Sequence, residues 1–371
     1  MSYRLNIQFG QGNDEIKNKK PPTASSSASM TTTTGSTSTF GGTTGTGSTS
    51  ALTVSRSQSQ QSIPTRSDLS AEPVTPARRA ESRSRYDHDV ATAREPLKPR
   101  RQLILMRHAE RLDRIFPMWQ RTAFRNNGQY QPYDLNQPPR LPLRAGGHQA
   151  FSEDTPITEL GGVSAQMVGR GLRMIGVLPH TVYTSPALRA VQSAARVVQA
   201  LQMPLHQQSA AKTQPIKVRL EPALFEWMGY YETPPTWLTT EECVRAGYPI
   251  DTDYRPYMSV REVLVNRAKE TNDQHWDRVE AAIRQILDSN RAGTVLIVGH
   301  APTVDAGRLL LGRVNQGMSK TAMDRMGLNY PYCSNVMLEE SDFGHWKLTE
   351  KLPPMTYLDF STQINHRFFS R

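Results

Sequence analysis

Short, largely apolar runs recur along the chain after position 100 and predict the strands of a sheet. Leu103 to Met106 and Thr294 to Val298 show no alternation of apolar and polar residues, which is typical of strands buried on both faces of a parallel sheet. Val182 to Thr184 and Ile216 to Leu220 predict two further short strands. Each run ends where glycine, serine or charged residues begin, so these four segments define the expected sheet.

Segments with helical spacing of apolar residues lie between these strands. Thr158 is the expected N-cap of one helix, and Ser185 followed by Pro186 predicts the start of another. A third amphipathic helix precedes the strand at Thr294. The apolar stripes are Ala165, Val168, Leu172 and Ile175; Leu188, Val191, Ala195 and Val198; and Trp276, Val279, Ile283 and Ile286. Alternation of strands and helices predicts an α/β fold with a mainly parallel sheet.

Two stretches depart from this rhythm. Residues 117–156 are rich in loop signals, and a loop of that length is usually functional or mobile. Residues 17–99 consist mostly of Ser, Thr, Gly, Pro and Gln and offer almost no apolar side chains to bury. We therefore expect residues 1–100 to form a disordered, basic, low-complexity tail and residues 101–371 to form one folded domain.

The composition excludes several classes of protein. The net charge is +10, but residues 78–101 contain eight Arg and Lys against four acidic residues, so much of the basicity lies in the tail. No nucleic-acid-binding module is recognisable, and we expect no nucleic-acid partner. No signal peptide or membrane-spanning run is evident, so no membrane insertion is expected. Two cysteines without metal-ligand spacing, Cys243 and Cys333, fit a reducing, cytoplasmic setting.

Candidate chemistry begins where the first strand ends. His108 follows Leu103–Met106 and lies between Arg107 and Arg111, and His300 follows the strand that ends at Val298. The carboxyl ends of parallel strands meet at one edge of a sheet, where ligands gather. An imidazole beside two guanidinium groups predicts an anion site with a nucleophile. The arginines also disfavour a protonated imidazole, which keeps His108 nucleophilic near neutral pH.

Two further residues fit this interpretation. Arg189 is expected in the first turn of its helix, off the buried stripe, where the free backbone N–H groups favour a phosphate. Glu226 lies between Phe225 and Trp227, and such surroundings tend to raise a carboxyl pKa, as a general acid requires. Glu110 is the rival acid.

Structural roles are the alternative for each of these residues taken alone. A histidine at a strand end is more often hydrogen-bonded within the structure, arginines often form ordinary ion pairs, and Glu226 alone is explained equally well as a carboxylate that orders an arginine. The joint pattern of two histidines at two strand ends favours the catalytic interpretation.

In combination these residues resemble the histidine phosphatase superfamily, which has the phosphoglycerate-mutase-like fold. The signature Arg-His-Gly is matched by Arg107-His108-Ala109, with alanine in place of glycine. The match is closer still to the phosphatase domain of ubiquitin-associated and SH3 domain-containing proteins. The shared segments are Arg107 to Asp113, Tyr133 to Asn136, Thr184 to Gln192, Glu221 to Trp227, Asp251 to Pro256 and Val298 to His300. No ubiquitin-associated or SH3 module is recognisable in residues 1–100.

The resemblance implies a three-layer α/β fold and a set of roles. His108 would become a phosphohistidine, Glu226 would protonate the leaving group, and no metal or other cofactor would be needed. Phosphate would be held by Arg107, Arg111, Arg189 and His300.

The resemblance leaves the substrate open. A phosphotyrosine protein or aryl phosphate is expected first, and a small molecule such as a steroid phosphate is the alternative. Ala109 and the missing recruitment modules keep open a weakly active phosphate-binding scaffold. The subfamily's tendency to dimerise leaves a homodimer open as well.

Overall fold

The computed structural model describes residues 101–203, 214–266, 270–313, 319–349, 352–357 and 360–370. The tail predicted for residues 1–100 lies outside the described residues. In chain order the elements are β1 (Arg101–Arg107), α1 (Leu112–Ile115), α2 (Trp119–Ala123), α3 (Glu159–Met174), β2 (Thr181–Thr184), α4 (Leu188–Gln202), β3 (Val218–Leu220), α5 (Thr240–Arg245), α6 (Val260–Asn266), α7 (Asn272–Ser289), β4 (Gly293–Gly299), α8 (Ala301–Asp305), α9 (Gly307–Leu310), α10 (Lys320–Asn329), β5 (Asn335–Glu340), β6 (Trp346–Leu348), β7 (Thr356–Tyr357), β8 (Phe360–Ser361) and α11 (His366–Phe369).

The central sheet has six strands in the order β3-β2-β4-β1-β5-β6. The first four of these strands run parallel, β5 pairs antiparallel with β1, and β6 pairs antiparallel with β5. The prediction of a mainly parallel α/β sheet is therefore confirmed. The two antiparallel strands were not predicted, and β3 begins at Val218 instead of Ile216.

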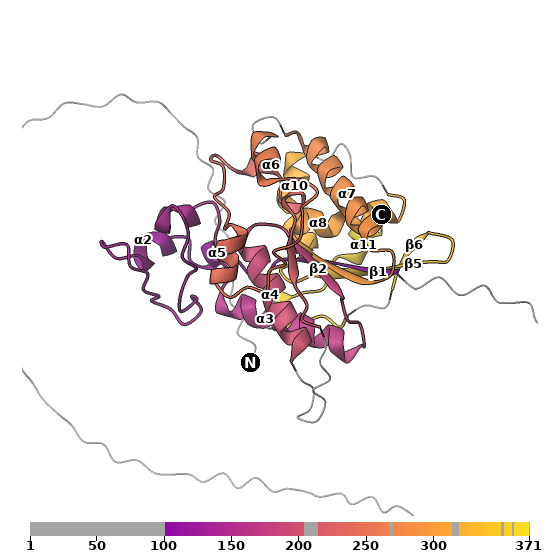
Figure 1. Cartoon of the computed structure of the whole chain (residues 1–371), viewed down its shortest axis with the longest axis horizontal. Coiled ribbons are helices and arrows are strands. Elements are labelled where there is room, and N and C mark those ends of the chain that lie inside the picture. Colours follow the sequence, from indigo (N-terminus) through magenta and orange to yellow (C-terminus); the bar gives the residue numbers. More distant parts are fainter. Residues whose placement is uncertain are drawn as a thin grey trace, which may run out of the picture. The chain divides into compact units, whose positions relative to one another are not determined.

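Helices cover both faces of the sheet (Figure 1), which gives three layers. Successive residues of β1 point to opposite sides, as strand geometry requires. Ile104 and Met106 pack with residues of α3 and α4, whereas Leu103 and Leu105 pack with residues of α7, α8 and α10. Because the strand is buried on both faces, an unbroken apolar run suits it better than alternation.

The predicted start of one helix is confirmed, and the predicted start of another is wrong; for the third helix only the apolar stripe was predicted. The Thr158 hydroxyl accepts from the Gly161 N–H at the start of α3. Helix α7 contains the predicted third stripe and begins at a capping box of Thr271 and Gln274. Ser185, however, does not cap α4. The helix begins at Leu188 with Ala187 at the N-cap position, which contributes no side-chain cap.

A carboxylate far away in the chain replaces the missing cap of α4. Asp154 Oδ1 accepts from the Leu188 N–H at 2.7 Å, and Asp154 Oδ2 forms a buried ion pair of 2.9 Å with Arg144 Nη2. Burial raises the pKa of this carboxyl against the influence of Arg144 and the Leu188 N–H. The start of α4 is thus fixed by tertiary contacts, which local sequence could not reveal.

The predicted long loop at residues 117–156 contains some regular structure. Helix α2 and the 3₁₀ helix Gly147–Phe151 lie within it. Their buried rings, Trp119 and Phe151, have centroids 6.0 Å apart. Packing of these aromatic side chains fixes part of a segment whose turn residues predicted loop throughout.

No helix in the described part of the chain is both long enough and apolar enough to cross a membrane.

Candidate active site

His108 and His300 lie at the carboxyl ends of the neighbouring parallel strands β1 and β4. The two ring centroids are 5.4 Å apart, because Arg107 and Gly299 are paired in the register of the strands. The His108 N–H donates to Gly299 O at 2.8 Å, and the Cys333 N–H donates to His108 O at 3.2 Å. Backbone hydrogen bonds on both sides therefore fix the position of His108.

The His108 ring presents its Nε2 atom to the centre of the site. Nδ1 lies 2.8 Å from Ala109 O, a pure acceptor, so Nδ1 carries the proton and Nε2 has the free lone pair. Arg189 Nε donates to this lone pair at 3.3 Å. Burial and the nearby charges of Arg189 and Arg107 hold the pKa of His108 well below its ordinary value. The ring is thus neutral and nucleophilic near neutral pH.

Arg189 is completely buried and lies between the two histidines and Glu226. Its Nη2 donates to Glu226 Oε2 at 2.6 Å and lies 3.3 Å from His300 Nδ1. The prediction that Arg189 belongs to the first turn of α4 is confirmed. The prediction that Arg189 lies off the buried side of the helix was wrong. Its guanidinium is buried among polar groups, and the spacing of apolar residues does not reveal a buried polar side chain.

Glu226 accepts two hydrogen bonds on one oxygen. Besides Arg189, the Tyr231 hydroxyl donates to Glu226 Oε2 at 2.5 Å. Burial alone would raise the pKa of Glu226, but the charges of Arg189 and Arg111 and the Tyr231 hydrogen bond outweigh burial and lower it. The predicted upward shift was therefore wrong for this arrangement of charges. Phe225 and Trp227 precede and follow Glu226 in the chain, whereas its hydrogen-bond donors come from elsewhere.

His300 is held by a hydroxyl from the end of β2. Ser185 Oγ lies 2.8 Å from His300 Nε2, so the serine expected to cap α4 instead orients this ring. His300 Nδ1 faces Arg189, which can only donate, and lies 3.7 Å from Glu226 Oε1. Burial holds the pKa of His300 well below its ordinary value, even though Glu226 opposes the shift.

Arg107 reaches the site from the last position of β1. Its Nη1 donates to Gly327 O at 3.1 Å and Tyr330 O at 2.5 Å, and its guanidinium lies 4.4 Å from the centroid of the Tyr332 ring. Burial lowers the pKa of Arg107, although Tyr332 and Glu226 oppose this effect. The side chain is oriented by backbone carbonyls, and no carboxylate among the described residues forms an ion pair with it.

Arg111 forms a bidentate ion pair with Asp113, with distances of 2.9 and 2.7 Å. Burial would lower the pKa of Arg111, but the Asp113 hydrogen bond and charge and the Glu226 charge raise it. Glu226 and His300 both experience the charge of Arg111. Arg111 therefore belongs to the same electrostatic cluster, and Asp113 orients it.

The two other positions singled out in the sequence have defined contacts. Glu110 Oε1 accepts from the Thr158 hydroxyl at 2.8 Å, at the start of α3. The Ala109 side chain is buried in the core, and its N–H donates to Ser193 Oγ at 2.8 Å. Ser193 Oγ donates to Arg189 O, so this chain of bonds links the backbone after His108 to α4.

Arg278 of α7 holds the loop that carries Glu226. Arg278 Nη1 donates to Ala223 O and Phe225 O, both at 2.9 Å, while its Nε donates to Glu270 Oε1 at 2.6 Å. Both partners of this ion pair are almost fully buried. The loop has little regular structure of its own, so the guanidinium fixes its path.

Sequence reasoning missed Tyr231, Asp113, Ser185 and Arg278 as parts of the site. Asp113 follows Arg111 by two residues, so that pair had a local signal. Tyr231 and Arg278 contact the Glu226 loop only in the folded chain, and no spacing rule reveals them.

Two buried donors near His108 remain unused. Among the described residues, Arg189 Nη1 and Arg107 Nε are buried nitrogen atoms without a hydrogen-bond partner. Buried N–H groups of charged side chains are rarely left unpaired, so their presence beside a neutral imidazole fits an oxyanion with several oxygens. Within the described residues, no group of three or more His, Cys, Asp or Glu side chains is arranged to hold a metal ion.

Comparison with known families gives a match over residues 143–350, to the model described as "Histidine phosphatase superfamily (branch 1)". Two curated relatives are the ecdysteroid-phosphate phosphatase of Drosophila melanogaster, 35% identical over 67% of this chain and 32% of the relative, and the human ubiquitin-associated and SH3 domain-containing protein B, 32% identical over 70% of this chain and 39% of the relative. The chain thus spans between about a third and two fifths of the length of these relatives.

Among solved structures, the Bombyx mori ecdysone phosphate phosphatase in complex with tungstate is similar to this chain. It has a TM-score of 0.59 and 30% sequence identity, and the match covers 72% of this chain and 99% of that one. The similarity therefore extends over nearly the whole of the solved domain.

Proposed function

The chain belongs to the histidine phosphatase superfamily (branch 1), and on that premise we propose that residues 101–371 form a metal-independent phosphomonoesterase domain. The observation that carries the proposal is the unprotonated Nε2 of His108 beside the unused donors of Arg189 and Arg107. A neutral imidazole aimed at an anion site is the arrangement that nucleophilic attack on phosphorus requires.

The proposed first step is attack of His108 Nε2 on phosphorus. The P–N bond forms, the P–O bond to the leaving group breaks, and a proton from Glu226 neutralises the departing oxygen. Arg107, Arg111, Arg189 and His300 hold the other phosphoryl oxygens. Three charge-assisted hydrogen bonds at about 1.5–3 kcal/mol each cannot supply the barrier reduction of roughly 20 kcal/mol that monoester hydrolysis needs. Covalent catalysis and proton transfer therefore contribute the remainder.

The second step releases phosphate. Water attacks the phosphohistidine, the Glu226 carboxylate takes the proton, and the P–N bond breaks to restore neutral His108. Glu226 must be protonated at the first step although its pKa is lowered in the free site. An arriving phosphoryl dianion competes for Arg189 and adds negative charge, and both effects raise the carboxyl pKa.

A cysteine nucleophile is the rival covalent mechanism, and the thiol environment opposes it. Cys333 lies next to the site, because its N–H donates to His108 O. Burial raises the pKa of its thiol to about 12, whereas reactive cysteines have a lowered pKa. Cys243 is also buried, and its thiol pKa is raised to about 12 by the same cause. Two buried free thiols suit the cytoplasmic setting that we include in the proposal.

For the substrate we propose phosphotyrosine proteins or related aryl phosphates, on the strength of the subfamily segments from Arg107 to His300. The similarity to the Drosophila ecdysteroid-phosphate phosphatase and to the Bombyx ecdysone phosphate phosphatase favours a second candidate, a steroid-type alkyl phosphate. The two classes differ in their leaving groups. A phenol is acidic, with a pKa of about 10, and leaves with little protonation, whereas an alcohol depends on the acid.

A substrate panel tests mechanism and substrate class together. Wild type, His108→Ala and Glu226→Gln are assayed on p-nitrophenyl phosphate, a phosphotyrosine peptide and a steroid phosphate. We expect no turnover by His108→Ala and a larger loss for Glu226→Gln on the alkyl ester than on the aryl esters. Exposed His345 provides the matched control, His345→Ala, which should retain wild-type rates. Equal activity of His108→Ala and wild type would exclude the proposal.

A third candidate function, a phosphate-binding scaffold with little turnover, is motivated by Ala109. Recovery of labelled phosphate on His108 after acid-free quenching would exclude a pure scaffold. A homodimer, proposed from the subfamily's behaviour, is tested separately by sedimentation of the purified domain.

A further inference from the structure

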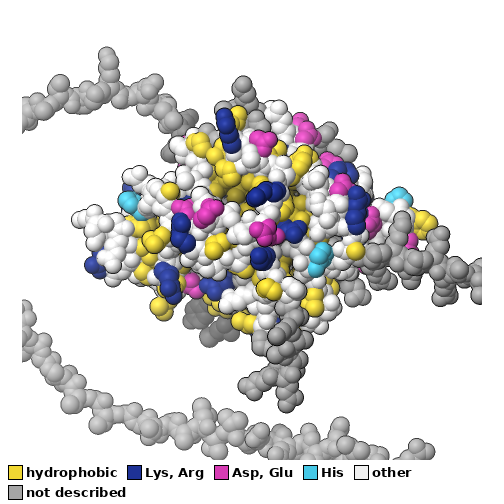
Figure 2. All heavy atoms as spheres, viewed as in Figure 1, with side chains coloured by type: hydrophobic (Ala, Val, Ile, Leu, Met, Phe, Trp, Pro, Cys, Tyr) yellow, Lys and Arg dark blue, Asp and Glu magenta, His cyan; other side chains and the backbone are white. Residues whose placement is uncertain are grey.

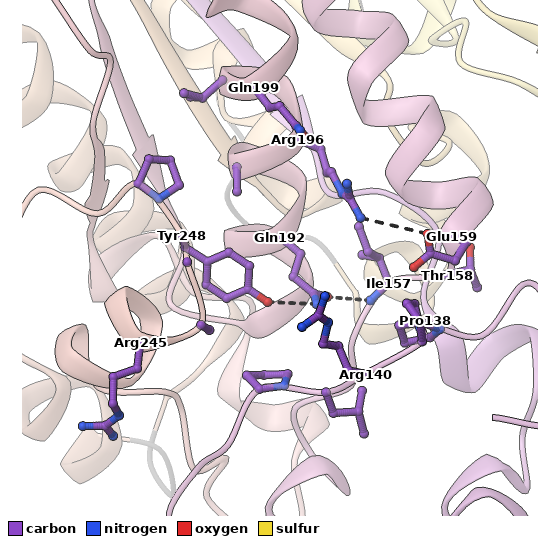
Figure 3. A pocket seen from close by; sticks show the side chains of 18 of the residues that line it. Pro138, Arg140, Ile157, Thr158, Glu159, Gln192, Arg196, Gln199, Arg245 and Tyr248 are labelled. Atoms are coloured by element: carbon purple, nitrogen blue, oxygen red, sulfur yellow. Dashed lines mark hydrogen bonds and ion pairs between the residues drawn. The ribbon is translucent and has the colours of Figure 1, made fainter. Parts of the chain in front are cut away.

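A second concave site lies away from the four residues of the proposed chemistry. A pocket of about 960 Å³ opens between α4, the segment Pro138–Leu143 and the turn Ala246–Pro249 (Figure 3). Its lining does not include His108, Arg189, Glu226 or His300. The size is at the upper end for a small-molecule site, which indicates room for a longer ligand.

The charges around this pocket are mainly positive. Arg140, Arg196 and Arg245 line it, against a single acidic residue, Glu159. Arg196 Nη2 lies 4.0 Å from Glu159 Oε2, and both side chains are more than a third exposed, so this pair is weak. Arg140 has no hydrogen-bond or ion-pair partner among the residues that the structure describes. Figure 2 shows separate dark-blue Arg and Lys side chains on the face seen in Figure 1, with magenta acidic side chains among them.

The three guanidinium groups do not converge on one point. Arg140 comes from the loop wall, Arg196 from α4 and Arg245 from the end of α5, and Figure 3 shows them well apart. A single phosphate is bound by donors that converge, as around His108. Separated arginines instead match a ligand that carries several negative charges along its length.

The floor of the pocket is rigid and elongated. Gln192 fixes it by donating to the Tyr248 hydroxyl at 3.1 Å and accepting from the Ile157 N–H at 2.9 Å. Gln192, Gln199 and Gln202 lie on one face of α4, over about 15 Å of helix axis. That length accommodates about four or five residues of an extended chain. Gln199 Oε1 accepts from Gln166 Nε2 at 3.0 Å, and the Gln199 Nε2 group can donate to a peptide backbone.

We propose that this pocket binds a short acidic peptide segment in an extended conformation. Carboxylate side chains would pair with the separated arginines, and apolar side chains would pack on the walls of Leu141, Pro142 and Pro249. The proposal is independent of phosphatase activity, since none of the catalytic residues lines the pocket. It adds a site for a protein segment to a domain whose other site fits a single oxyanion.

The test measures fluorescence anisotropy of a labelled short peptide that alternates glutamate and leucine, with its lysine–leucine counterpart as the peptide control. Arg140→Ala, Arg196→Ala and Arg245→Ala should each weaken binding roughly two- to fivefold, as expected for exposed ion pairs. Ala195→Trp, which fills the pocket without changing charge, should weaken it more than about tenfold, as lost pocket contacts do. Hydrolysis of p-nitrophenyl phosphate by each variant reports that it is folded.

Arg170→Ala is the matched protein control, because Arg170 is an exposed arginine of α3 outside the pocket. It should bind the acidic peptide like wild type. Equal weakening by Arg170→Ala would identify non-specific attraction and overturn the proposal. Failure of the acidic peptide to bind would also overturn the proposal. Displacement of the peptide by citrate at a similar concentration would overturn it as well, and would indicate a site for small anions.

Discussion

Arg189 and Glu226 form an ion pair of 2.6 Å in the interior of the proposed active site. The proposed phosphate ligand and the proposed acid are therefore partners of each other before any anion arrives. An oxyanion that recruits Arg189 weakens this pair, and the carboxyl pKa must then rise. Binding of the anion and protonation of Glu226 are thus thermodynamically linked.

The first prediction is proton uptake on anion binding. Sulfate stays fully ionised at about pH 5, so its binding should draw up to one proton onto Glu226 as the lowered pKa rises. Calorimetry in two buffers with different ionisation enthalpies measures this proton. Glu226→Gln should bind sulfate without uptake, and uptake equal to that of wild type would assign the proton to another group.

The second prediction concerns stability against pH. His275 is fully buried, and burial and Arg278 hold its pKa well below the ordinary value. Above about pH 6.5 the His275 imidazole is neutral in the unfolded chain as well as in the folded one. Below that pH it gains a proton in the unfolded chain only. His275 therefore lowers stability by about 1.4 kcal/mol per pH unit as the pH falls from 6.5 toward the folded-state pKa. In urea unfolding, His275→Gln should reduce this slope by that amount, and exposed His345→Gln should not.

The third prediction concerns the Glu226 loop. A lysine at position 278 keeps the charge but cannot reach the two carbonyls and Glu270 together. Arg278→Lys should lower kcat by about 10- to 100-fold, with a smaller change in KM, because a small displacement of a catalytic group is costly. Arg284 forms an ion pair of the same 2.6 Å length on the exposed face of α7. Arg284→Lys should leave kcat within about twofold. Similar losses in both variants would contradict a positioning role.

The fourth prediction concerns the start of α4. Asp154→Ala removes the acceptor for the Leu188 N–H and leaves Arg144 buried without its counter-charge, which should cost about 3–5 kcal/mol in urea unfolding. Sulfate should also bind more weakly, because Arg189 lies in the same turn. Asp134 accepts a backbone N–H as well, but on the surface. Asp134→Ala should cost less than about 1 kcal/mol.

The fifth prediction concerns the alanine in the signature. The methyl group of Ala109 is buried in the core, and its backbone N–H and C=O already serve Ser193 and His108. Ala109→Gly should therefore leave kcat within about twofold and lower stability by about 1 kcal/mol. A tenfold gain in kcat would show instead that the methyl group obstructs the site.

The mainly parallel strands and the two histidines at strand ends could be predicted because they depend on local pattern. An unbroken apolar run such as Leu103–Met106 implies burial on both faces, and parallel strands bring their carboxyl ends to one edge. His108 and His300 thereby meet without any knowledge of the loops.

The electrostatics of Glu226 and the cap of α4 could not be predicted in this way. Phe225 and Trp227 are visible beside Glu226 in the sequence, whereas Arg189 and Tyr231 reach it only after folding. Asp154 likewise caps a helix that begins 34 residues later in the chain. Local apolar context indicates desolvation, but the sign of a pKa shift depends on charges that tertiary structure brings close.

The position of His108 is fixed by main-chain atoms, the C=O of Gly299 and the N–H of Cys333. Substitution of the neighbouring side chains leaves these two hydrogen bonds available. Over evolutionary time, loops around the site are therefore free to diverge toward new leaving groups while the proposed nucleophile keeps its place. The position of His108 can therefore persist while the sequence of the surrounding loops, and with it the substrate preference, changes.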